Sequence, residues 1–372
     1  MNKQLFARST RPAAVILLLA FAFSIPKLNL GTAGILPGQL NSPGSLQILA
    51  LMCVFGALAL SYDVLFGITG VMSFGHALFF AIAAYMPALA MNTWHWGFYQ
   101  AVALGIILPP FVALVVGAIA NRVSGIAFAM VTLAFAQAAS IVISDNILPV
   151  FGAEQGLTLP SGNLPSPMVG IFNVQYRYWL CLIVLIIVAL LVAWVTSSNA
   201  GRVWHAIREK ELRVSVLGLQ PYWHKLGAFV FASFLAGLCG VAYVITTGIA
   251  DPSITLATFT LSLLLMVVIG GSGRISGAIL GGLLYEYLSQ RLAGLADTPA
   301  ITRLPSLLSV PFQQPTFTLG VLFILIVFFA PGGLIRIPER IRSRRRRDSA
   351  DDTDEYEPLP EVADSERIGG AP

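Results

Sequence analysis

Long apolar runs alternate with short polar segments along most of the chain. Ten runs are candidate membrane-spanning helices, because crossing a hydrocarbon core of about 30 Å takes about 20 apolar residues. They cover residues 13–30, 46–62, 74–92, 98–120, 126–148, 178–196, 226–248, 256–271, 275–290 and 316–330. The last three runs are short, so one of them could be a broken or re-entrant helix. The pattern predicts an all-α polytopic membrane protein with about ten transmembrane helices, in the range of eight to ten.

Composition agrees with this prediction. Hydrophobic residues make up 56% of the 372 residues and charged residues only 11%, with a mean hydropathy of +0.80. Soluble domains carry about 25% charged residues. The deficit extends over nearly the whole length, which excludes a soluble domain with a single anchor. We expect residues 1–335 to form one transmembrane domain and residues 336–372 to form a charged, disordered cytoplasmic tail.

Positive charge gathers on one side of the predicted spans. With ten spans and the amino terminus inside, the cytoplasmic segments hold 18 of the 22 Lys and Arg residues. Such an excess is typical of cytoplasmic segments. We therefore expect both termini in the cytoplasm, together with the loops 63–73, 121–125, 197–225 and 272–274. The first apolar run could also be a signal peptide, but an uncleaved first span is favoured because many spans follow.

Little in the sequence indicates bond-making chemistry. The three cysteines lie inside apolar runs and the four histidines show no ligand spacing, so no disulfide framework or metal site is predicted. The chain contains no GxxxxGK[ST] run and does not hydrolyse nucleotide through a P-loop. A membrane-embedded enzyme would have to use His76, which has no obvious partner in the sequence. We expect no enzyme activity, no cofactor bound by this chain and no nucleic-acid partner.

One cytoplasmic segment is longer and more amphipathic than a connector needs to be. Residues 206–220 read AIREKELRVSVLGLQ, and Gly218 followed by Pro221 is typical of a helix end. The alternative is an ordinary positively charged loop, but a connector needs only a few residues and an apolar stripe on a loop helix needs a partner surface. The residues predicted to contact a soluble partner are Ala206, Arg208, Glu209, Glu211, Arg213, Leu217 and Gly218.

A second group of polar and glycine residues lies at the ends of spans or inside them. Glycines before the predicted third span allow a broken helix or a close helix contact. Ser73 and His76 are polar where polar groups are costly, so they either bond a neighbouring helix or line a wet path. Thr132 and Gln137 should face the bundle interior. The predicted translocation path consists of Thr69, Gly70, Ser73, Gly75, His76, Thr132 and Gln137.

Four patches, taken in this order, resemble the permease subunit of branched-chain amino acid ABC importers of the LivM type. They are YDVLFGITGVMSFGHALFF (62–80), FAMVTLAFAQ (128–137), the segment 206–244 and VVIGGSGRISGAILGGLL (267–284). The resemblance covers about residues 46–335. It implies that 206–220 is a coupling helix, which inserts into a cleft on an ATP-binding subunit.

The resemblance also implies the partners and the location. The chain would pair with a homologous second permease, two ATP-binding subunits and an extracytoplasmic solute-binding protein, in a bacterial-type cytoplasmic membrane. The partner subunits would use the ATP, and the solute would be a branched-chain or related small amino acid. Related permeases carry urea, short amides or other small solutes, so that solute class stays open. The alternative from another class is an ion-coupled secondary carrier, but the spans lack an evident set of ion-coupling groups.

Overall fold

The described part of the chain is almost entirely helical. The computed structural model describes residues 20–28, 31, 37–147, 150–160, 162, 164–168, 170, 173–296, 315–329 and 332–336. Within these residues, two strands, β1 (Leu157–Thr158) and β2 (Ile249–Ala250), form a single antiparallel pair. The prediction of an all-α membrane protein is confirmed.

The longer helices follow one another along the chain, and the segment between α5 and α6 also contains η3, β1 and η5. They are α2 (Pro43–Asp63), α3 (His76–Thr93), α4 (Phe98–Ala120), α5 (Ile126–Ser144), α6 (Val174–Ser197), α7 (Asn199–Val216), α8 (Pro221–Thr247), α9 (Ala257–Gly270), α10 (Ile275–Ala296) and α13 (Pro315–Phe329). A π-helical segment, η2 (Val64–Thr69), continues directly from α2. Short 3-10 turns are η1 (Ile25–Lys27), η3 (Ala153–Gln155), η5 (Ser166–Met168), η7 (Pro252–Thr255) and η8 (Leu334–Arg336).

The apolar runs of the sequence correspond closely to these helices. Among the described residues, six helices are long and apolar enough to cross a membrane, namely α2 with η2, α3, α4, α5, α6 and α8. Helix α9 is a shorter apolar helix, and α4 has the predicted bounds of 98–120. Most of the predicted first span, 13–30, lies outside the described residues, as do residues 297–314 and 337–372 of the predicted loop and tail.

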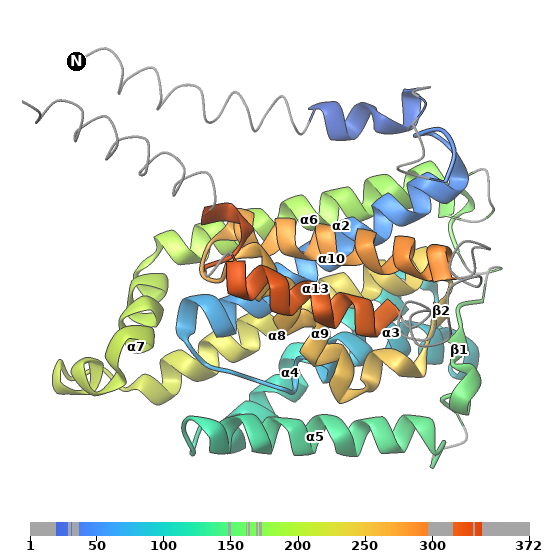
Figure 1. Ribbon diagram of the computed structural model, residues 1–372. Coiled ribbons are helices and arrows are strands. Elements are labelled where there is room, and N and C mark those ends of the chain that lie inside the picture. The colour runs from blue at the N-terminus through green and yellow to red at the C-terminus, as the bar shows by residue number, and fades with distance from the viewer. Residues whose placement is uncertain are drawn as a thin grey trace, which may run out of the picture.

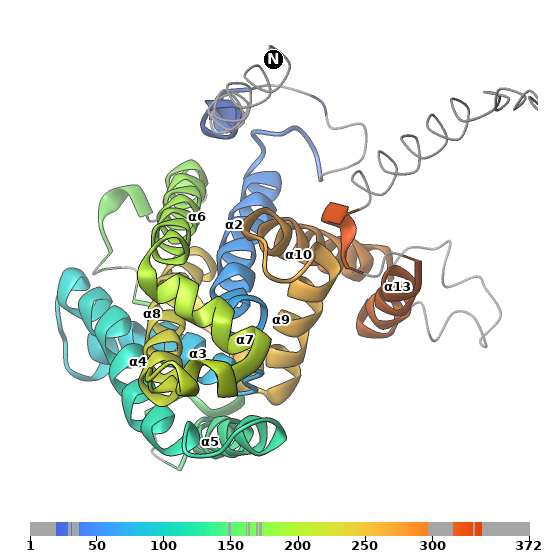
Figure 2. The same cartoon turned by 90° about the vertical axis from the view of Figure 1, so that its left-hand side faces the viewer.

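Three helices form the centre of the bundle. In the most apolar 18-residue stretch of each helix, at least 72% of the residues are buried in α2, α3 and α8, compared with 28–33% in α4, α5 and α6. Seen from the end, α4, α5, α6 and α13 lie around these central helices (Figure 2). Exposed side chains such as Phe111, Ile126 and Leu190 give the outer helices an apolar surface, as expected for helices that face lipid.

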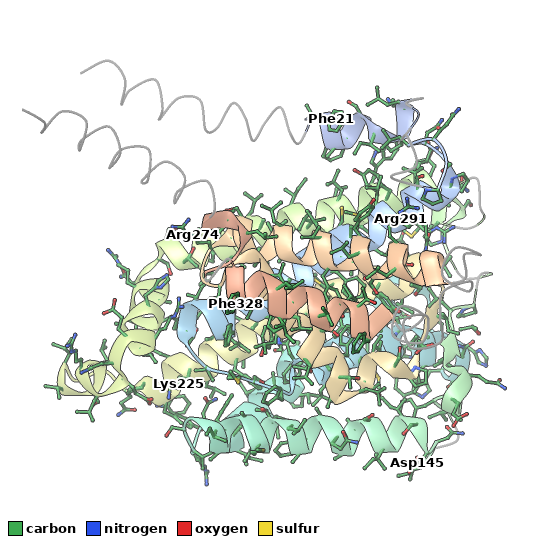
Figure 3. The ribbon with its side chains drawn as sticks, in the orientation of Figure 1. Phe21, Asp145, Lys225, Arg274, Arg291 and Phe328 are labelled. Carbon is green, nitrogen blue, oxygen red and sulfur yellow. The ribbon has the colours of Figure 1, made fainter. Side chains whose placement is uncertain are left out.

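The two ends of the bundle differ. Helix α7 lies across one end and the β1–β2 pair lies at the other (Figure 1). Lys225 and Arg274 lie at the α7 end, whereas Asp145 and Arg291 lie at the opposite end (Figure 3). The loops after α2, α4 and α9 also reach the α7 end, because they share contacts or a pocket with α7. These loops are the ones that the charge pattern groups on one side.

Candidate functional site

Helix α7 contains most of the predicted coupling segment but has different bounds. The helix begins at Asn199 and not at residue 206, because the extended backbone of Ser198 ends α6 and the next helix starts at once. Non-helical backbone at Lys210 divides α7 into two parts. The helix ends at Val216, and Gly218 has a φ of +82°, a conformation that favours glycine. The predicted end of the helix at Gly218 is therefore confirmed.

One face of α7 is fixed to the bundle. Trp204, Ile207 and Val214 are buried, and the indole Nε1 of Trp204 donates to the His224 carbonyl at 3.0 Å. Lys225 at the start of α8 pairs with Glu211 of α7 at 2.6 Å. An indole and an ion pair, from different positions along α7, thus attach this helix to α8.

The opposite face of α7 is open. The predicted coupling residues all have exposed surface: Ala206, Arg208, Glu209, Glu211, Arg213, Leu217 and Gly218. Two of them also contact the bundle, because Glu211 pairs with Lys225 and the Arg208 guanidinium donates to the Gly67 carbonyl. The exposed fraction is 76% for Leu212 and 78% for both Val216 and Leu217. These three apolar side chains line a shallow groove together with Lys210 and Arg213. We call this set the α7 groove.

A break in the backbone separates α2 from α3. The π-helical segment η2 ends at Thr69, and the next residue, Gly70, has a φ of +78°. The Thr69 hydroxyl donates to the Val64 carbonyl at 2.8 Å, across the last turn of η2. Residues 70–75 then cross to the start of α3 without regular structure. The glycine-rich approach to this span therefore forms a broken helix, one of the two alternatives that the sequence allowed.

Hydroxyl groups from α5, from α9 and from the segment before α3 accept hydrogen bonds from backbone amides where α3 begins. Phe74 N–H donates to Thr132 Oγ1 of α5 at 3.2 Å, and Ala77 N–H donates to Thr260 Oγ1 of α9 at 3.2 Å. Gly75 N–H donates to Ser73 Oγ, also at 3.2 Å. Free amides at a helix start need such acceptors. Ser73 and Thr132, predicted as path residues, thus bond the protein's own backbone.

His76, the first residue of α3, is buried against α2. Its Nε2 lies 2.8 Å from Ser61 Oγ, and the Ser61 hydroxyl lies 2.7 Å from the Leu58 carbonyl, to which it donates. Because the Ser61 O–H donates to the Leu58 carbonyl, the Ser61 oxygen accepts a hydrogen bond from His76 Nε2–H. This tautomer leaves His76 Nδ1 as an acceptor. Nδ1 of His76 has no hydrogen-bond partner among the described residues, and neither does the nearby Tyr62 hydroxyl.

Gln137 is a correction to the predicted orientation of the α5 side chains. Thr132 is fully buried, but Gln137, on the same helix, is exposed on the outside of this chain. The two residues are five positions apart, and at 3.6 residues per turn this puts their side chains about 140° apart around the helix axis, so they lie on different faces of α5. The expectation that both face the interior of the bundle was wrong for Gln137.

A pocket of about 480 Å³ opens at the α7 end, beside the break. Thr69 and Gly70 line it, together with Phe74, Phe128 and Met130. Glu211 and Lys225, the ion pair between α7 and α8, contribute to the same pocket. Of the predicted path residues, Thr69 and Gly70 line this pocket, whereas Ser73, Gly75, His76 and Thr132 are buried nearby.

One residue that the sequence did not place in the site, Asp63, is central to this end of the bundle. Asp63, the last residue of α2, is fully buried and accepts two hydrogen bonds from Gly273 N–H. A carboxylate at a span end in a chain with 11% charged residues was a visible signal. Its partner is a backbone amide from the turn between α9 and α10, and pairing with a backbone group leaves no pattern in the sequence.

Comparison with known proteins agrees with this architecture. Residues 44–330 match the family model described as branched-chain amino acid transport system / permease component. The chain is similar to the high-affinity branched-chain amino acid transport system permease protein LivM of Salmonella typhimurium, with 25% identity over 315 residues, or 75% of this chain and 72% of that protein. It is 26% identical to LivM of Escherichia coli over 311 residues, with the same shares covered.

A third relative comes from another organism. The chain is 27% identical over 249 residues to the probable branched-chain amino acid transport permease protein LivM of Methanocaldococcus jannaschii, covering 64% of this chain and 68% of that protein. No solved structure matches the chain. Because the family model covers most of the chain, the chain belongs to the branched-chain amino acid transport system permease family.

Proposed function

We propose that this chain is the transmembrane permease subunit of an ABC importer for branched-chain amino acids, driven by ATP that partner subunits hydrolyse. The observation that carries the proposal is α7. It is a charged helix outside the apolar bundle, attached by Trp204 and by the Glu211–Lys225 pair. The α7 groove exposes three large apolar side chains. Exposed apolar patches of this kind are typical of surfaces that bind a partner protein.

The proposed partners are those that membership of the permease family implies. Two ATP-binding subunits would bind at the α7 end, which we assign to the cytoplasm because of the positive charge gathered there. A second, homologous permease would pack against this one, and an extracytoplasmic solute-binding protein would deliver the solute to the opposite end. Gln137 supports the paired arrangement, because an exposed amide in an apolar helix is costly in lipid and is better placed against protein or water.

The solute path would run past the break between α2 and α3 toward the pocket at the α7 end. Thr69 and Gly70 line that pocket, and its Phe and Met side chains suit an apolar solute. His76 Nδ1 is a buried acceptor without a partner among the described residues. Uptake by Ser73→Ala, His76→Ala and Gln137→Ala variants tests this path. We expect at least His76→Ala to lower uptake, and unchanged uptake in all three would remove them from the path.

Reconstituted transport tests the proposed function. The complete complex, placed in proteoliposomes, should take up radiolabelled leucine when ATP and the solute-binding protein are both supplied. Urea and acetamide, offered in the same way, should not be taken up. Uptake driven by an ion gradient without ATP would contradict the proposal, and uptake of urea or acetamide in place of leucine would change the solute class.

A further inference from the structure

A buried carboxylate joins three segments at the α7 end. Asp63 closes α2, and its two carboxylate oxygens accept from the same amide, Gly273 N–H, at 2.9 and 3.1 Å. Gly273 belongs to the turn between α9 and α10, far from Asp63 in sequence. Contact between α2 and this turn is close, because a Cβ on Gly67 would overlap both the Asp63 carboxylate and the Gly273 amide. Only glycine fits there.

Arg208 brings α7 into the same joint. Its guanidinium donates to the carbonyl of Gly67 in η2, and Gly67 packs against the Asp63 carboxylate. The aliphatic part of its side chain lies against Gly70, directly after η2. Its Nη1 also lies beside Gly273. One side chain of α7 therefore contacts the end of α2 and the turn before α10.

A carboxylate in this place is costly unless it is paired. Taking an ionised carboxylate out of water costs several kcal/mol, which hydrogen bonds and a nearby cation have to offset. A neutral Asn could accept from Gly273 N–H without that cost. A charged Asp63 differs from Asn in that it attracts a cation. Its charge therefore has a role if the position of the Arg208 guanidinium, and so of α7, affects how α2 and the α9–α10 turn are held together.

We propose that Asp63 and Arg208 are positioning residues that transmit movement of α7 to the spans. The inference rests on the proposed function, because it needs an ATP-binding subunit to move α7. When α7 shifts, Arg208 moves relative to Asp63 and the Gly67 carbonyl. The end of α2 and the turn before α10 then move with it. Since η2 leads directly to Gly70 and the break before His76, the same movement reaches the proposed path.

Because α7 has other attachments to the bundle, the role of Arg208 can be tested separately from folding and from docking of a partner. Trp204 and the Glu211–Lys225 pair hold α7 to α8 without Arg208. The α7 groove does not include Arg208 among its lining residues. An Arg208→Ala variant should therefore keep α7 in place and keep the proposed docking surface, while it loses the link to α2.

The test measures leucine uptake and ATP hydrolysis together. The complete complex in proteoliposomes would be compared for wild type, Arg208→Ala, Arg208→Lys, Asp63→Asn and Arg202→Ala. Arg202 is the matched control, because it is an exposed arginine of α7 that bonds Asn199 of its own helix. Retention of the ATP-binding subunits and the melting temperature of the complex would be recorded for each variant.

We expect Arg208→Ala and Asp63→Asn to keep the ATP-binding subunits and to transport about tenfold less leucine per ATP hydrolysed, within the usual range of coupling between sites. Arg208→Lys should recover part of this ratio, and Arg202→Ala should match wild type. An unchanged ratio in Arg208→Ala overturns the inference. So does loss of the ATP-binding subunits or of the folded complex, since Arg208 would then be a docking or structural residue. If wild type itself shows no ATP-dependent leucine uptake, the proposed function fails, which is a different result.

Discussion

At the scale of single residues, side-chain hydroxyl groups stabilise the backbone at the break between α2 and α3. The Thr132 and Thr260 side chains accept from backbone amides at the start of α3, from helices α5 and α9. The His76 ring is held by Ser61 of α2. Polar residues inside these apolar helices therefore have structural partners within the chain. Their role in solute passage is a separate question, and stability measurements can distinguish the two.

Thr132→Val should destabilise the protein. The substitution keeps the shape of the side chain but removes the acceptor for Phe74 N–H, and an unpaired buried donor costs about 1–3 kcal/mol. Thermal unfolding of the purified protein in detergent would show a lower melting temperature, and Thr132→Ser should restore it. The control is Gln137→Leu, on the exposed face of α5, for which we expect no loss of stability. A Thr132→Val protein as stable as wild type would contradict the capping role.

At the scale of elements, α7 is the helix that sets this chain apart from a simple bundle. Its buried side chains, Trp204, Ile207 and Val214, face α8 and the loops, while its other face is open. The kink at Lys210 lets the second part of the helix diverge from the first. The α7 groove lies on that second part. The element is therefore anchored along one face and free along the other.

Gly218→Ala should loosen the end of α7. Gly218 has a positive φ, and an L-residue in that conformation costs about 1 kcal/mol, so local opening of the last turn should become roughly fivefold more frequent. Amide hydrogen exchange followed by mass spectrometry would report this in the last turn of α7. Gly227→Ala is the matched control, since a Cβ there meets open space within α8. Equal exchange in the two variants would contradict the assigned role of Gly218.

The elements were largely predictable from the sequence, and the site was not. Long apolar runs predict helices because a segment that crosses the membrane or fills the centre of a bundle has to be apolar. The predicted bounds of α4, 98–120, are those of the structure. Helix α7 was predicted too short, because its start depends on one extended residue, Ser198. Gln137 was placed on the wrong face, because an apolar helix gives no periodic signal to orient it. Asp63 was missed as a site residue because its partner is a backbone amide.

At the scale of the whole molecule, the bundle has two unlike ends. One has α7, the break after η2 and the pocket, and the other has the β1–β2 pair (Figure 1). The apolar outer faces of α4, α5 and α6 lie between these ends. The proposed function requires this asymmetry, because solute would arrive at one end and the ATP-binding subunits would act at the other. The sidedness is therefore a property of the whole chain that can be tested directly.

Cysteine labelling should show the orientation. The native Cys53, Cys181 and Cys239 are buried and should react little, so single cysteines placed at exposed Ser124 and Ser166 can be followed. We expect Ser166→Cys to react with a membrane-impermeant maleimide in intact cells and Ser124→Cys to react only after permeabilisation. The reverse pattern would place the α7 end outside and contradict the account.

The most direct test of the central claim is co-purification. The tagged chain, solubilised in a mild detergent, should bring ATP-binding subunits with it, and Val216→Glu should lose them because a charge would enter the α7 groove. Arg202→Glu, at the other end of α7, should retain them. Recovery with wild type and Arg202→Glu but not with Val216→Glu is the predicted result. If no ATP-binding subunit accompanies the wild-type chain while transport persists, α7 is not a dock and the chain is not an ABC permease.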